Sequence, residues 1–217
     1  MTPQERKEHT EQYLREKGII VNPTLPVLRS ASEITLKDLD TVCKRAVAAL
    51  LSTQIGISLG ERKMDDVDFF AGLMEHFNVK DCLNQLELRF FDGTVSEQDI
   101  IDVVWEYECF WSLAWALGLI DDIADASSEC DCIKAIKLVS ECRDYETFRS
   151  RCRMRSPDEI MDMLDLYWRY HWAAVEERID PSKSAGKLDE EVILERRRGL
   201  EWLICDTDDW HDLTIDT

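Results

Sequence analysis

Signals that begin helices recur along this sequence before apolar residues spaced three and four apart, whereas the alternation typical of strands is almost absent. The run Ser-Pro-Asp-Glu at 156–159 places an N-cap, a proline at the first helical position and a glutamate at the third. It predicts a helix from Pro157 to about Arg178. The run Thr-Pro-Gln-Glu at 2–5 predicts a first helix in the same way, which Gly18 ends. The sequence therefore predicts an all-α fold.

The central segment 96–118 carries the strongest helical pattern. At 1.5 Å per residue a helix over it would span roughly 35 Å, the length of a small domain, so we expect it to be the core helix. Residues 19–28 contain two prolines that push the preceding residues out of the α region, which predicts an extended strap or short strand. The remaining helices are expected over 35–56, 66–77, 80–91, 133–141, 145–151 and 190–204.

These ranges predict a single-domain orthogonal helical bundle of about seven to nine helices. Residues 1–28 would form the N-terminal helix and the strap. Residues 29–217 would form the helical domain, with an acidic and irregular tail from Cys205. A minor extended or β segment near the N-terminus is the alternative to a purely helical fold.

The chain is strongly acidic: its 217 residues include 45 Asp and Glu against 26 Lys and Arg, a formal net charge of −19. With 45% hydrophobic residues and 7 Trp it can bury a sizeable core, unlike acidic disordered chains. Such a charge repels phosphate backbones and anionic headgroups, so we expect neither nucleic acid nor a membrane surface as partner. The charge favours a basic protein partner.

The segment Met1 to Lys17 is charged throughout and lacks the apolar stretch of a signal peptide. The longest apolar run, Cys109 to Ile120, falls short of the ~20 residues of a spanning helix. Eight cysteines, several inside apolar helical stretches, favour reduced thiols and a cytoplasmic location. Four of them between 130 and 152 are candidate zinc ligands, but the CxxC pairs of zinc sites are missing, so we expect no metal and no cofactor.

Glu108 shares a helical face with the two tryptophans that follow it by three and seven residues, so its carboxylate is expected inside an aromatic core. A buried charge needs a partner. The candidates are Arg169, one turn after Asp165, and Arg198, three residues after Glu195.

Two interpretations of these side chains are open. In the first, they form salt bridges that fix how three helices pack. In the second, some of them line a polar pocket with His171, which would act as a general base oriented by Glu108 or Glu195. The two interpretations differ in whether the side chains surround a cavity or close on one another. The residues concerned are Glu108, Asp165, Arg169, His171, Glu195 and Arg198.

The tail holds five aspartates between 206 and 216, which we expect to be solvated, and Trp210, which we expect to dock on the domain. Five arginines concentrate positive charge between 143 and 155. They either balance the protein's own carboxylates or bind a phosphate or an acidic partner. They are Arg143, Arg149, Arg151, Arg153 and Arg155.

Five segments are distinctive: Trp-Glu-Tyr-Glu at 105–108, Leu-Ala-Trp-Ala-Leu-Gly at 113–118, Asp-Leu-Tyr-Trp-Arg-Tyr-His-Trp-Ala at 165–173, residues 192–203 and Asp-Thr at 216–217. Their order and spacing, from about Arg29 onward, resemble the bacterial family catalogued as domain of unknown function 4272. The resemblance implies a cytoplasmic bacterial helical protein. It implies no activity, because none is assigned to the family.

A binding or interaction module is the function that these observations favour, because the sequence has an acidic helical surface and lacks a recognisable nucleophile, phosphate loop or metal motif. An immunity-like protein that neutralises a basic toxin is one example. The alternative is an enzyme of unknown reaction with a polar pocket around Glu108, His171 and Glu195, and a third class is a structural subunit. The sequence predicts no oligomeric state.

Overall fold

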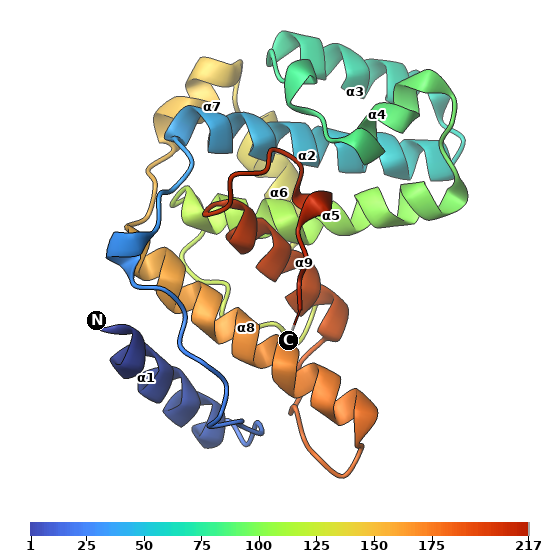
Figure 1. Ribbon diagram of the computed structural model, residues 1–217. Helices are drawn as coiled ribbons and strands as arrows, with labels where there is room; N and C mark the ends of the chain where they lie inside the picture. Colours follow the sequence, from blue (N-terminus) through green and yellow to red (C-terminus); the bar gives the residue numbers. More distant parts are fainter. Residues whose placement is uncertain (217) are drawn as a thin grey trace.

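The computed structural model describes residues 1–216, and over this range it contains nine α-helices and no β-strand (Figure 1). The predicted all-α fold is therefore confirmed, and the strap at 19–28 is irregular rather than a strand. The helices are α1 (Pro3–Glu16), α2 (Leu39–Gly60), α3 (Met64–His76), α4 (Gln85–Asp92), α5 (Glu97–Ala116), α6 (Cys132–Ser140), α7 (Tyr145–Arg151), α8 (Pro157–Ile179) and α9 (Glu190–Trp202).

The helix starts that capping signals predicted rest on local hydrogen bonds. At the start of α8, Ser156 Oγ accepts from the Glu159 amide at 3.3 Å, and the Glu159 carboxylate accepts from the Ser156 amide at 2.9 Å. The same reciprocal pair is present at the starts of α1 and α5. Each pair satisfies amides that the helix itself leaves without acceptors. The predicted ranges of α7 and α8 agree with the structure to within one residue.

Two predicted ranges are wrong. α2 begins after an Asp38 cap rather than near residue 35, and it continues through both glycines that were expected to end it. Gly56 allows close packing inside the helix, because a Cβ there would lie 3.4 Å from the Val104 side chain. The range 80–91 is a 3-10 turn followed by α4, because Asn84 caps a new helix.

The helices pack in the succession α3, α2, α5, α9, α8 and α1, so α5 is the central helix, as predicted (Figure 1). α9 crosses α5 closely at Gly199, where an added Cβ would lie 2.2 Å from Ser112 Oγ and 3.0 Å from the Cys109 carbonyl oxygen. Any side chain there would push the two helices apart. Of the described helices, α2 alone is long and apolar enough to cross a membrane, and 78% of that window is buried inside the bundle.

Two buried arginines tie residues 1–28 to the rest of the chain, one through an ion pair and one through a hydrogen bond. Arg6 of α1 is 1% exposed and donates to Asp162 of α8 at 2.7 Å. Arg169 of α8 donates to the Pro26 carbonyl of the strap at 3.3 Å. α1 and the strap are therefore held along α8, where Figure 1 shows α1 lying beside it.

The C-terminal segment docks on the bundle. Trp210 is 1% exposed, as predicted, and its ring contacts that of Trp202, with centroids 6.0 Å apart. The expectation of a wholly solvated tail is wrong, because the Asp209 carboxylate accepts from the Gln85 amide at 3.0 Å. The other tail aspartates are exposed.

Candidate functional site

Glu108 is buried, as predicted, but its partner is neither Arg169 nor Arg198. Glu108 Oε2 accepts from Arg196 Nε at 2.7 Å, and Oε1 accepts from the Cys130 amide at 2.6 Å. The partner does come from the last helix, as expected. The predicted Arg198 lies two positions after the actual partner, Arg196. Because successive residues of a helix project about 100° apart, these two arginines of α9 point in different directions, and only Arg196 points toward Glu108.

The enzyme hypothesis requires Glu108, His171 and Glu195 to lie at one site. Instead, each of them contacts a different one of three consecutive arginines of α9. Because these arginines project in different directions, their partners lie around α9 rather than at one point. Glu108 lines one of the cavities described below, whereas His171 and Glu195 line none of them. The contacts are Arg196 with Glu108 (2.7 Å), Arg197 with His171 (2.8 Å) and Arg198 with Glu195 (3.0 Å).

Asp165 and Arg169 pair with each other inside α8. Arg169 Nε and Nη2 donate to the two carboxylate oxygens at 2.9 and 3.0 Å, and both residues are at most 2% exposed. Arg169 Nη1 also lies 3.6 Å from Glu11 of α1. This pair therefore holds α1 and the strap, and it forms a network separate from that of Glu108.

His171 contacts an arginine rather than the carboxylate that the general-base hypothesis required. A guanidinium can only donate, so Nδ1 of His171 accepts from Arg197 Nη1 and the ring proton resides on Nε2. Burial, together with the charges of Arg197 and Arg178, lowers the pKa of His171 to about 4. The ring is therefore neutral at pH 7 in the folded protein.

This environment predicts acid sensitivity that depends on His171. Because its folded-state pKa lies below the ordinary 6.5, its contribution to stability is complete above pH 6.5 and is lost as pH falls toward 4. His171→Asn keeps an acceptor near the position of Nδ1 but does not titrate. Between pH 7.5 and 5.0, the parent should lose about 2 kcal/mol more unfolding free energy than this variant in urea denaturation. Equal losses in the two proteins would contradict the assignment.

Sequence reasoning missed a buried ionic cluster around Arg45 of α2, which is 3% exposed. Its Nη1 donates to Glu87 at 2.8 Å, and its Nη2 lies 3.5 Å from Glu106. Burial raises the pKa of Glu87 to about 7, although Arg45 opposes the shift. The available signal was a pair of adjacent cations, Lys44 and Arg45, inside the otherwise apolar run 42–51. Glu106 also accepts from Asn84 (2.8 Å), Trp210 (3.2 Å) and His211 (2.8 Å).

The loop at 117–131 contains five carboxylates and no lysine or arginine. Side chains from α8, α9 and the segment before α8 hold this loop through its main-chain carbonyl groups. Arg155 donates to the carbonyls of Ile120 (3.0 Å) and Asp121 (3.1 Å). Tyr167 donates to the carbonyl of Ile123 (2.5 Å), and Tyr170 donates to that of Ala124 (3.1 Å). Arg196 donates to the carbonyls of Asp125 (2.6 Å) and Ser128 (3.2 Å).

The carboxylates of this loop face solvent. Asp121, Asp122 and Asp125 are exposed, and none forms an ion pair within residues 1–216. The arginines that hold the loop have carboxylate partners elsewhere, at 3.0 Å for Arg155 and 2.7 Å for Arg196. Hydrogen bonds from Ser127 lower the pKa of Asp125, which keeps it ionised. The loop is therefore an anchored acidic strip.

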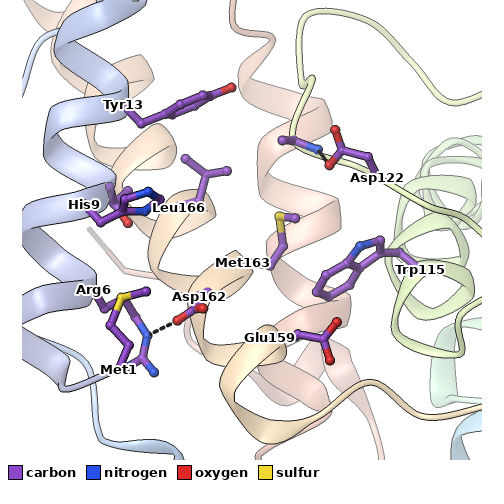
Figure 2. Close-up of a pocket in the computed structure, with 12 residues that line it drawn as sticks. Met1, Arg6, His9, Tyr13, Trp115, Asp122, Glu159, Asp162, Met163 and Leu166 are labelled. Carbon is purple, nitrogen blue, oxygen red and sulfur yellow. Dashed lines mark hydrogen bonds and ion pairs between the residues drawn. The ribbon is translucent and has the colours of Figure 1, made fainter.

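A cavity of about 440 Å³ opens beside this strip, between α1, α8 and the end of α5 (Figure 2). Asp122 lies at its loop edge. Arg6 and Asp162 line the opposite side, where they pair at 2.7 Å. Its largely apolar wall consists of Tyr13, Trp115, Met163 and Leu166.

A second cavity, of about 500 Å³, continues along the same loop. It also includes Asp125, while Lys17 and Lys187 line its other side. Because the two cavities have common walls, they form one groove, which we call the acidic groove. The shared lining residues are Tyr13, Asp122 and Ala124.

All eight cysteines are free, as predicted. Within residues 1–216, no group of three or more His, Cys, Asp or Glu side chains is placed to hold a metal ion. Burial raises the pKa of the Cys109 thiol well above its usual value, with the Glu195 charge adding to the effect. This thiol is therefore poorly suited to act as a nucleophile.

Three of the five arginines between 143 and 155 pair with the protein's own carboxylates. This supports the balancing role over the capture of a phosphate or acidic partner. The pairs are Arg143 with Asp144 (2.9 Å), Arg149 with Asp40 (3.2 Å) and Arg155 with Glu159 (3.0 Å).

Comparison with known proteins identifies one family. The model described as Domain of unknown function (DUF4272) matches residues 6–213. No curated protein and no solved structure matches the chain significantly. The match begins at Arg6 inside α1 and extends past the docked Trp210, so the family pattern includes nearly the whole bundle.

Proposed function

We propose that this chain, which belongs to the DUF4272 family of domains of unknown function, is a non-catalytic binding module that captures a basic segment of a partner protein in the acidic groove. The observation that carries this proposal is how the loop at 117–131 is held. Arg155 and Arg196 donate to its main-chain carbonyls, and its carboxylates form no ion pair within residues 1–216, although Lys17 and Lys187 line the second cavity of the groove. Lysines and arginines of the partner would supply cations for these carboxylates.

The net charge of −19 supports the same partner class, because an acidic field speeds the encounter with a basic protein. Affinity needs a further source, since exposed ion pairs contribute only about 0.2–1 kcal/mol each. An apolar side chain that fills the cavity beside Trp115 and Met163 would add about 1.5–3 kcal/mol. We therefore infer a segment in which arginines or lysines flank an aliphatic or aromatic residue.

The alternative, an enzyme that uses Glu108, His171 and Glu195, has weaker support, because each of these residues contacts a different arginine of α9. The eight free thiols support a cytoplasmic location as part of the proposal. A basic toxin that an immunity protein neutralises is one partner of the proposed kind, whereas nucleic acid and membrane surfaces are not.

The test uses a fluorescein-labelled peptide of sequence Gly-Arg-Gly-Arg-Leu-Arg-Gly-Arg in stopped-flow binding. The triple variant Asp121→Asn, Asp122→Asn, Asp125→Asn removes three charges, and the new amides can still accept from the amides of Ala124 and Ser127. We expect roughly tenfold weaker binding than in the parent. Association with the parent should slow as the Debye length falls from about 10 Å at 0.1 M salt to about 3 Å at 1 M.

A matched control separates the groove from the overall charge. The variant Glu141→Gln, Glu146→Gln, Glu191→Gln removes the same number of exposed charges from the C-cap of α6, from α7 and from α9, at positions that form no ion pair in the described chain. It should bind nearly as well as the parent. Equal losses of peptide affinity in the two triple variants would refute capture at the acidic groove. So would an association rate that does not change with salt concentration.

A further inference from the structure

Most of the exposed large apolar side chains belong to helices α3 to α6. Of the ten large apolar side chains exposed in residues 1–216, seven belong to these four helices. Phe69 of α3 and Ile133 of α6 are 60% and 68% exposed, and Ile101 of α5 is 50% exposed. Phe69 and Ile136 line the same cavity, and apolar surfaces of this kind often mark binding sites.

Two cavities, of about 480 and 360 Å³, lie along α2, and Phe69 and Ile136 are the exposed apolar side chains that line them. Gln54 and Ile136 line both, so the cavities form one continuous groove, which we call the apolar groove. Its first half includes Ile57 and its second half Leu50, seven residues apart on α2. That separation is ~10 Å along the helix axis, so the groove accommodates about two turns of another helix.

Acidic side chains lie at or beside both cavities of the apolar groove. Glu129 lines the first cavity, and Asp66 lies one turn before the Phe69 and Phe70 wall of the second. Neither carboxylate forms an ion pair within the described residues. Arg143 also lines the second cavity, with its charge already opposed by Asp144 at 2.9 Å. The rim thus presents carboxylates that lack internal partners.

We propose that the apolar groove binds an amphipathic helix of a partner protein. Its apolar residues, at positions i, i+4 and i+7, would enter the groove above Ile136, and its lysines or arginines would face Glu129 and Asp66. The proposal stands apart from capture at the acidic groove, because the cavities of the two grooves share no lining residue.

Charge complementarity favours this occupant over a second copy of the chain. Helix α3 alone carries four acidic residues and no lysine or arginine, and the chain as a whole has a net charge of −19. Two such faces would repel each other on approach, whereas a basic helix would be attracted. The same charge disfavours an anionic lipid surface.

Two 14-residue peptides test the proposal by fluorescence anisotropy. The two peptides have the same amino-acid composition of alanine, lysine and leucine. Only one of them, the striped peptide, places its leucines at i, i+4 and i+7 and so on one face of a helix. The striped peptide should bind at least about tenfold more tightly, since filling the groove requires one apolar face. Ile136→Glu should weaken its binding by about tenfold or more, and Ile179→Glu, at the 69% exposed end of α8, should leave it unchanged.

Phe69→Ser provides a second variant at a 60% exposed position, where the ring contributes little to folding. Phe69→Ser should also weaken binding of the striped peptide. The circular dichroism spectrum of the variant should equal that of the parent. Equal binding of the two peptides, or equal effects of Ile136→Glu and Ile179→Glu, would overturn the proposal. A parent that sediments as a dimer and becomes a monomer on Ile136→Glu would assign the apolar groove to a second copy and overturn it as well.

Discussion

Replacing Glu108 with alanine is expected to lower the free energy of unfolding by about 3 to 5 kcal/mol. The substitution leaves Arg196, which is 2% exposed, without its carboxylate, and an uncompensated buried charge has a cost of this size. It also removes the acceptor of the Cys130 amide, so the loop at 117–131 loses one of its anchors. Urea denaturation at pH 7, followed by tryptophan fluorescence, measures the change.

The exposed pair of Arg178 with Glu190 provides the control. Its atoms are 3.1 Å apart, but the two side chains are 63% and 31% exposed. Glu190→Ala should therefore change the free energy of unfolding by no more than about 1 kcal/mol. If Glu108→Ala costs no more than this control, then the carboxylate is solvated and the buried pair is contradicted.

The sequence predicted helix starts well, because capping is a local interaction. The reciprocal bonds of Ser156 and Glu159 join residues three apart, so they can be recognised without any knowledge of the fold. Glycine was a less reliable guide. Gly56 was expected to help end α2, but it lies inside the helix, where its role depends on the neighbouring Val104 of α5. That neighbour cannot be identified from local sequence.

The same limit explains the wrong partner for Glu108. Helical spacing placed this carboxylate in the core, but which of three consecutive arginines meets it depends on how α9 crosses α5. That crossing is set by the close approach at Gly199, through atoms of Ser112 and Cys109. Positions 196 to 198 differ by about 100° each, so only the crossing geometry distinguishes them.

The acidic groove was also beyond prediction from sequence, although its charges were visible. Five carboxylates between 117 and 131 are evident in the sequence, and a loop of this kind is usually interpreted as a solvated segment. What distinguishes it is that Arg196, 71 residues after Asp125, donates to a main-chain carbonyl rather than to a carboxylate of the loop. In a count of charges Arg196 cancels one carboxylate. In the structure it holds the main chain of the loop and leaves the Asp125 carboxylate without an ion pair in the described residues.

Replacing Arg45 with methionine is expected to destabilise the protein by about 3 to 5 kcal/mol at pH 8. Methionine keeps much of the apolar contact with the Trp210 ring, over which the guanidinium lies at 4.1 Å. It removes the cation that Glu87 and Glu106 share, and both carboxylates are fully buried. Two like charges in such a site cannot both remain ionised at low cost, so one or both must bind a proton.

The effect of Arg45→Met should therefore depend on pH. Because the pKa of folded Glu87 is about 7 and its ordinary value is 4.5, its contribution to stability is present below pH 4.5 and lost as pH rises toward 7. Without Arg45 the folded-state pKa rises further and the loss continues above pH 7. The destabilisation measured in urea should be at least about 2 kcal/mol larger at pH 8 than at pH 5.

Adding Glu87→Gln and Glu106→Gln to Arg45→Met should remove this extra loss at pH 8, because the amides do not titrate and can still accept the hydrogen bonds that Asn84 and Trp210 donate to Glu106. The unfolding free energy of the triple variant should then fall less between pH 5 and pH 8 than that of the parent, in which Glu87 still titrates. A loss that is equal at pH 5 and pH 8 in Arg45→Met itself would mean that the guanidinium acts by packing alone. A difference that persists in the triple variant would place the titrating group outside the cluster.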